Sequence, residues 1–176
     1  MLDSYFEMEK ERAKAGLPPL ALTPAEVEEV CKNLESANKE KVDLLRGLLE
    51  KRVAPGVDAS AKVKAEWLAA VAKGKTVSAA GSREDAVRIL GTMLGGYNVD
   101  PLVEALSDRA IAAAAAEALK RVVLVYGHFD TIVKMSATNP LAKSVLESWA
   151  AGEWFLGRAA FPETLVLKVF KVDGEI

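Results

Sequence analysis

The stretch "ILGTMLGGYNVDPLVEAL", from Ile89 to Leu106, decides how the helices of this chain are joined. Its glycines invite comparison with phosphate-binding loops, but no Gly-Lys-Ser/Thr follows, and the glycine spacing does not fit the dinucleotide fingerprint. The apolar residues up to Leu94 continue a helical pattern that begins at Ser82, so Gly95 or Gly96 is expected to end that helix. Asp100 and Pro101 then resemble the start of the next helix. The sequence therefore predicts a joint between two helices. Tyr97 and Asn98 are expected at an exposed turn that a ligand or a partner could contact.

Helix signals dominate the rest of the chain up to residue 163. Thr23 precedes Pro24 and has Glu26 at the capping-box position, and Ser82 has the same relation to Asp85. Asp58 and Asn139 are further predicted N-caps. The segment "SDRAIAAAAAEALKRVVLVYGHF" is apolar around most of its circumference, which predicts one long, central and buried helix.

The predicted caps Thr23, Asp58, Asp100 and Asn139 recur at intervals of about 40 residues. That interval is typical of HEAT repeats, in which each unit is a pair of helices. The sequence thus favours an all-α, HEAT-like superhelix for residues 1–163. An irregular helical bundle remains the alternative, because the units share no matching residues.

The C-terminal segment "TLVLKVFKVDGEI" departs from the helical pattern. Leu165, Leu167 and Val169 alternate with the residues between them, and β-branched and aromatic side chains predominate, which predicts a β-strand. A lone strand leaves its backbone groups unpaired, so its partner is expected in a further domain or a second copy. Residues 164–176 are therefore predicted to be a strand and linker towards a domain outside this sequence.

Composition and charge exclude several classes of protein. Lys and Arg number 23 and Asp and Glu 25, a balance that argues against a nucleic-acid-binding surface. No block of like charge suggests binding to a membrane surface, and no apolar run is long enough to span a bilayer. With a single cysteine and no signal-peptide pattern at the N-terminus, the chain is expected in the cytoplasm.

Catalytic candidates are few. His128 is the only histidine, and Asp130 beside it does not complete a catalytic arrangement, although a small enzyme that uses this pair remains an open hypothesis. Cys31 lies on the apolar stripe of its helix, so a buried thiol is expected. One cysteine and one histidine cannot build a structural zinc site or an iron–sulfur cluster. We therefore expect no catalytic, cofactor-binding or metal-ligating residue in this chain.

An aromatic cluster precedes the predicted strand. Trp149, Trp154 and Phe155 are expected either in the core or, together with Arg158, on a contact surface, because aromatic residues and arginine often anchor protein interfaces. The residues predicted to bind a partner are Tyr97, Asn98, Trp154, Arg158, Leu165, Leu167 and Val169.

Three blocks of this sequence resemble the N-terminal region of bacterial aconitase B. They are "RVAPGVDASAKVKAEWLAAVAKGK" (52–75), "ILGTMLGGYNVDPLVEAL" (89–106) and "SWAAGEWFLGRAAFPETLVLKVFKVDGE" (148–175). The resemblance implies a HEAT-like domain, followed in that family by a swivelling domain and by domains that hold a 4Fe–4S cluster. It implies a part of an aconitate hydratase that is inactive alone, and that takes part in self-association, in partner recognition and in shaping the route to the active site. A free-standing adaptor derived from an aconitase is the alternative.

Overall fold

The computed structural model describes every residue except 1, 37–38, 123 and 153–176, and this part of the chain is all α-helical. In chain order the helices are α1 (Leu2–Lys14), α2 (Pro24–Ser36), α3 (Lys39–Lys51), α4 (Ala59–Ala72), α5 (Arg83–Leu90), α6 (Val99–Ala105), α7 (Ala112–Leu119), the 3-10 turn η1 (Tyr126–His128), α8 (Phe129–Ser136) and α9 (Pro140–Ala150). The predicted all-α class is confirmed. The predicted strand at 164–176 lies outside the described residues.

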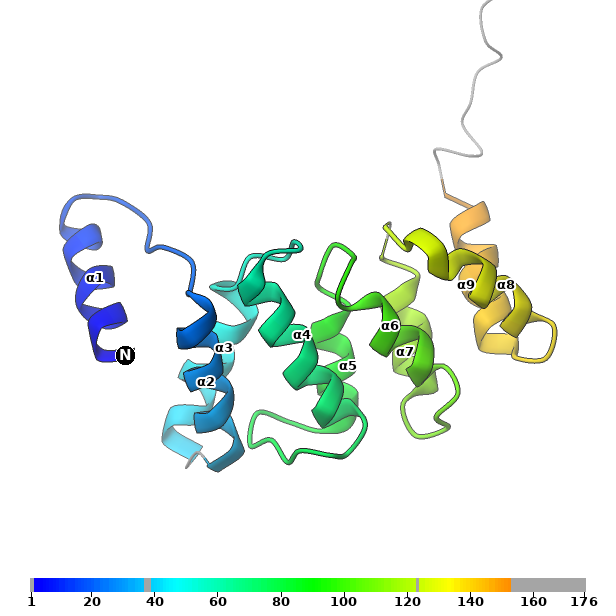
Figure 1. Ribbon diagram of the computed structural model, residues 1–176, viewed down its shortest axis with the longest axis horizontal. Helices are drawn as coiled ribbons and strands as arrows, with labels where there is room; N and C mark the ends of the chain where they lie inside the picture. The colour runs from blue at the N-terminus through cyan, green and yellow to red at the C-terminus, as the bar shows by residue number, and fades with distance from the viewer. Residues whose placement is uncertain (1, 37–38, 123, 153–176) are drawn as a thin grey trace, which may run out of the picture.

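After α1, the helices form four pairs that lie side by side in a row (Figure 1). The pairs are α2 with α3, α4 with α5, α6 with α7, and α8 with α9. Neighbouring pairs are joined through α2 on α4, α5 on α7, and α7 on α9. The main contacts between pairs all join neighbours in the row, which is the arrangement expected of a helical-repeat protein.

The apolar stripes of the helices form one core that runs along the row. Helix α2 buries Val27, Val30, Cys31 and Leu34, which are the residues whose spacing predicts its inner face. Complete burial of one such aliphatic side chain contributes about 1.5–3 kcal/mol. Among the described residues, no helix has the length and apolar character needed to cross a membrane.

Most of the predicted helix starts are confirmed. The Ser82 hydroxyl accepts a hydrogen bond from the Asp85 backbone N–H, and the Asp85 carboxylate accepts one from the Ser82 backbone N–H at 2.9 Å. The Asp58 carboxylate accepts from the Ala61 N–H at 2.9 Å. The Asn139 side-chain oxygen accepts from the Leu141 N–H at 2.9 Å, while its amide donates to the Leu106 carbonyl, also at 2.9 Å. Asn139 therefore both starts α9 and ties it to α6.

The predicted series of caps at intervals of about 40 residues is wrong for its last two members, Asp100 and Asn139. Helix α6 begins at Val99 and has Asn98, not Asp100, at its N-cap position, so Asp100 lies in the first turn. Asn139 starts α9, which is the second helix of its pair, whereas Thr23, Asp58 and Asn98 precede the first helices of theirs. The first helix of the fourth pair, α8, begins at Phe129, which has no cap signal in its sequence.

Two predicted helices are shorter than their apolar patterns indicate. Helix α5 ends at Leu90, so the predicted continuation to Leu94 is wrong. Beyond it the chain tightens into a turn, in which the N–H groups of Thr92 and Met93 donate to the carbonyls of Ile89 and Leu90. The single long helix predicted around the alanine run is also wrong, since α7 is helical only from Ala112 to Leu119. Beyond Leu119 the valine-rich sequence has low helix propensity, and Leu124 forms a parallel bridge with Gly95 instead.

Candidate interaction surface

Three loops that are distant in the sequence meet along one edge of the row. They join α3 to α4, α5 to α6, and α7 to η1 (Figure 1). The Leu94 N–H donates to the Pro55 carbonyl at 3.0 Å, which ties the first two loops together. The Gly95–Leu124 bridge ties the second loop to the third. These contacts make one continuous surface out of three connections.

Glycine is required where these loops touch. Gly95 and Gly96 have φ angles of 129° and 90°, a region that side chains of L-residues disfavour. A Cβ at Gly95 would lie 2.4 Å from the Leu124 carbonyl oxygen, and one at Gly96 would lie 2.5 Å from Cγ1 of Val57. The glycine pair of the opening sequence therefore allows close contact between loops. It shapes the loop after α5 rather than ending that helix.

Four large apolar side chains project from this edge. Val57 is 61 % exposed, Leu94 60 %, Leu124 47 % and Tyr97 40 %. We call these four residues the loop ridge. Exposed apolar side chains that cluster on a fixed backbone are typical of binding surfaces. The predicted exposure of Tyr97 is confirmed.

Asn98 does not share that exposure, and its predicted position at an exposed turn is wrong. Its side chain is fully buried, and its amide donates to the carbonyls of Leu90 at 2.9 Å and Met93 at 3.3 Å. The Leu90 carbonyl, at the end of α5, also accepts from the Met93 N–H at 3.1 Å, so Asn98 gives it a second donor. The Met93 carbonyl belongs to the segment after α5. Asn98 therefore fixes the loop between α5 and α6 from its buried side.

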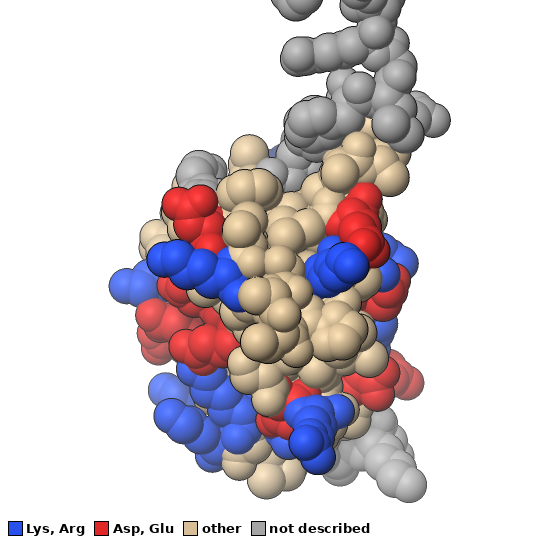
Figure 2. Space-filling view, turned by 90° about the vertical axis from the view of Figure 1, so that its right-hand side faces the viewer, with Lys and Arg blue, Asp and Glu red and all other residues tan. Residues whose placement is uncertain are grey.

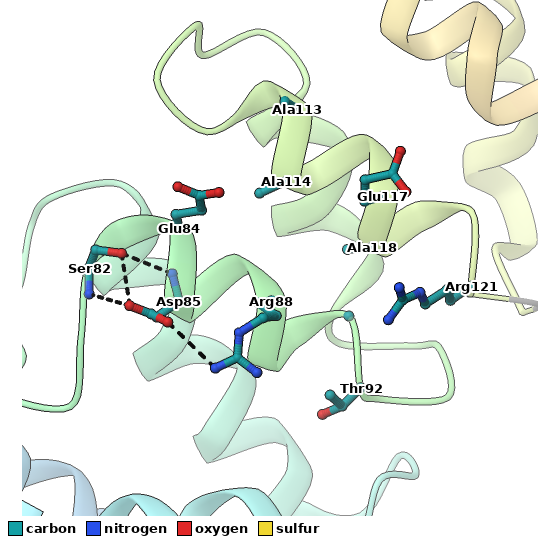
Figure 3. A pocket seen from close by; sticks show the side chains of 11 residues that line it. Ser82, Glu84, Asp85, Arg88, Thr92, Ala113, Ala114, Glu117, Ala118 and Arg121 are labelled. Atoms are coloured by element: carbon teal, nitrogen blue, oxygen red, sulfur yellow. Dashed lines mark hydrogen bonds and ion pairs between the residues drawn. The ribbon is translucent and has the colours of Figure 1, made fainter.

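A groove of about 530 Å³ lies between α5 and α7 on another part of the surface (Figure 3). The small residues Gly91 and Ala118 line it, together with the charged side chains of Arg88 and Glu117. Ser82 lines it too, but its hydroxyl is engaged in the capping box with Asp85. The Ser82 backbone N–H also donates to the Asp85 carboxylate, and this hydrogen bond holds the pKa of the Asp85 carboxyl below its usual value. The groove thus offers charge and shape, but Ser82 is not poised as a nucleophile.

The two other titratable candidates, His128 and Cys31, also lie in surroundings that favour a structural role over a catalytic one. His128 Nε2 lies 3.1 Å from Asp100 Oδ1, so the histidine pairs with the start of α6 rather than with Asp130. Cys31 is buried, and burial raises the pKa of its thiol to about 12. A thiolate at this position would be strongly disfavoured. Over the described ranges, no three side chains of histidine, cysteine, aspartate or glutamate come together as a metal site.

The described part of the chain holds only some of the residues predicted to bind a partner. It includes Tyr97 and Asn98, whereas Trp154, Arg158, Leu165, Leu167 and Val169 lie outside it. Sequence reasoning missed Val57, Leu94 and Leu124. A signal for the first two exists, because each lies in or beside a glycine-containing turn where an apolar residue has no helical neighbour to cover it.

The family model described as the Aconitate B N-terminal domain matches residues 4–155, which is most of the chain. The chain belongs to this aconitase B N-terminal family. The resemblance in the three sequence blocks is thereby confirmed.

Relatives in this aconitase B family extend the match over nearly the entire chain. Aconitate hydratase B of Helicobacter pylori is 47 % identical over 99 % of this chain, and that of Synechocystis is 43 % identical over 99 %. Aconitate hydratase B of Escherichia coli is also 43 % identical. In each case the chain spans about 20 % of the relative's length.

Proposed function

We propose that this chain is the protein-interaction domain of an aconitate hydratase B and that the loop ridge is its principal contact surface. The observation that carries the proposal is the exposure of Val57, Leu94, Tyr97 and Leu124 on three loops joined by backbone contacts. Such a surface needs little ordering when it binds, which lowers the entropic cost of association. Tyr97 adds an aromatic side chain with a hydroxyl, a type that often dominates binding energy.

The proposed partners are the other domains of the same enzyme and a second copy of this chain. In this proposal the ridge takes part in self-association and in partner recognition, and it helps to shape the route to the active site. Balanced charge does not favour nucleic acid as a partner. We place the protein in the cytoplasm, in keeping with its single cysteine.

The chemistry is assigned to the rest of the enzyme. An aconitate hydratase interconverts citrate and isocitrate through cis-aconitate at a 4Fe–4S cluster. Cysteine thiolates hold such clusters, and this chain has one cysteine, whose thiol is buried and has a raised pKa. The residues present do not fit a cluster, so this chain contributes binding rather than catalysis.

Self-association is tested by sedimentation of the purified chain over a range of concentrations. The wild-type chain should shift reversibly towards a dimer as its concentration rises, and Leu94→Ser should reduce that shift because it removes an exposed apolar contact. Val77→Ser is the matched control, since Val77 is 81 % exposed but lies between α4 and α5, away from the ridge. A monomer at all concentrations, or an equal effect of both variants, would show that the loop ridge takes no part in self-association.

The absence of catalysis is tested by an assay with citrate after reconstitution with iron and sulfide. The chain should give neither turnover nor a stable cluster absorbance. Either signal would overturn the division of roles between this chain and the rest of the enzyme.

A further inference from the structure

The row of helical pairs ends at α8 and α9 in a face that no described element covers. Viewed from this end, a band of uncharged surface runs down the middle of the molecule between flanks of charged side chains (Figure 2). Helical-repeat proteins normally close their ends with a polar outer face, because an open end exposes the surface that the next repeat would bury. Among the residues that the structure describes, none forms such a polar cover over the middle of this end.

The exposed apolar side chains of this end belong to α8. Phe129 is 48 % exposed and Val133 is 42 % exposed, and a spacing of four residues places them on the same side of the helix. Among the residues of α8, Ile132 alone is buried. Helix α8 is therefore apolar over a wider arc than its contact with α9 covers.

Trp149 continues this surface on α9. Its indole N–H donates to the Leu119 carbonyl at 3.0 Å, which fixes the ring against the end of α7. Phe129 stacks on the Trp149 ring, with centroids 6.2 Å apart and planes at 23°. The result is a fixed aromatic surface close to the point where α9 ends at Ala150. We call Phe129, Val133 and Trp149 the end face.

We propose that residues 153–163 of this chain, "EWFLGRAAFPE", dock on the end face and close the row of helices. Only Ala151 and Gly152 separate the segment from Ala150, the last residue of α9, which follows Trp149 in the sequence. Trp154, Phe155 and Leu156 are three consecutive large apolar residues. Side chains of this kind suit an exposed apolar surface such as the end face.

The length of the segment fits this path. An α-helix of 11 residues, such as α9, is about 16 Å long. Eleven residues in extended form reach about 36 Å, so residues 153–163 can turn back along α9 and cross to α8. Covalent attachment also gives the segment a high effective concentration at this face, which a separate molecule must match by affinity. In this arrangement Trp154 binds its own domain and not a partner.

A double-mutant cycle in the full chain tests the contact. Val133→Asp changes the end face, Trp154→Ser changes the segment, and unfolding in urea gives the equilibrium constant of each variant. If the segment covers Val133, Val133→Asp should be strongly destabilising in the wild-type chain and close to neutral in Trp154→Ser. The expected coupling between the two changes is about threefold or more in the unfolding constant.

Val77→Asp provides the control, because its exposed side chain lies far from this end of the row. It should combine additively with Trp154→Ser. If Trp154→Ser fails to fold, Phe155→Ser takes its place in the same cycle. Additive behaviour of Val133→Asp with both segment variants overturns the proposal.

Hydrogen exchange and sedimentation separate this arrangement from contact with a second copy. Backbone amides of residues 153–163 should exchange slowly in the monomer, independently of concentration, and rapidly in Val133→Asp. Protection that appears only as the mass doubles would instead assign the end face to a second copy and overturn the proposal. This result does not depend on the loop ridge, whose contribution to association is read from Leu94→Ser.

Discussion

Gly91 lies so close to Ala118 that a Cβ at position 91 would be 2.6 Å from the Cβ of Ala118. This contact sets the approach of α5 to α7 and hence the stacking of the second pair on the third.

Gly91→Ala should destabilise the chain by about 1–3 kcal/mol, because the added methyl group overpacks the contact between α5 and α7. Urea unfolding followed by circular dichroism measures the change. Gly47→Ala is the matched control, since Gly47 lies within α3 and a Cβ there meets nothing within 4 Å. That variant should be more stable than wild type by about 0.5–1 kcal/mol. Equal effects of the two substitutions would contradict the close approach.

Asn98→Ala should cost about 1–3 kcal/mol, because the Met93 carbonyl loses its buried donor and the Leu90 carbonyl, which also accepts from the Met93 N–H, loses one of its two donors. Tyr97→Ala, at the neighbouring and exposed position, should change stability by less than about 0.5 kcal/mol. Thermal unfolding of the two variants makes the comparison. The assignment of Asn98 to structure and Tyr97 to the surface fails if their effects on stability are reversed.

The buried side chain of Lys64 should make the folded chain more stable at alkaline pH. Its side chain is almost fully buried in α4, and burial lowers the pKa of its amine. The unfolded chain therefore binds a proton more readily than the folded chain does, so this group opposes folding at neutral pH. The penalty should fade as the pH rises towards about 10.4, the ordinary pKa of lysine.

Lys64→Met removes this penalty and should stabilise the chain at pH 7 by about 1 kcal/mol, with a smaller gain at high pH. Urea midpoints across the alkaline range measure the difference. Lys62→Met changes an exposed lysine of the same helix and should shift the midpoint little at any pH. A destabilised Lys64→Met with unchanged pH dependence would show that the amine is satisfied inside the protein.

Asp85 should make the stability of the chain depend on pH at the acidic end of the range. Its carboxyl pKa is lowered, first by the hydrogen bond from the Ser82 backbone N–H. A depressed pKa contributes stability above the unfolded value of about 3.9, and that contribution is lost as the pH falls through the folded value. Asp85→Asn should therefore be less stable than wild type at pH 7 and approach it near pH 3. Glu84→Gln, an exposed change of the same charge, is the control. A gap between Asp85→Asn and wild type that stays constant with pH would exclude this role.

The sequence predicts those parts of the fold that depend on local chemistry. Ser82 with Asp85, and Asn139 with Pro140, identify their helix starts because the cap and its partner lie within a few residues. The close approach of α5 to α7 could not be read in the same way. It depends on Ala118, far along the chain, which meets the backbone at Gly91.

The same limit applies to the candidate site. Tyr97 could be placed at a surface turn from the glycines beside it, but Asn98 has the same local signals and is buried by the loop fold. Val57 and Leu124 join the loop ridge only because Gly96 and Gly95 touch their segments across the row. No local pattern contains that pairing.

The most direct test of the proposed interaction domain is a calorimetric titration of this chain into Helicobacter pylori aconitate hydratase B from which the region matching it has been removed. The wild-type chain should bind with a one-to-one stoichiometry. Leu94→Ser and Tyr97→Ser should each weaken binding about tenfold, and Val77→Ser should bind like wild type. No binding by the folded wild-type chain, or equal binding by all four proteins, would contradict the claim that the loop ridge is a contact surface.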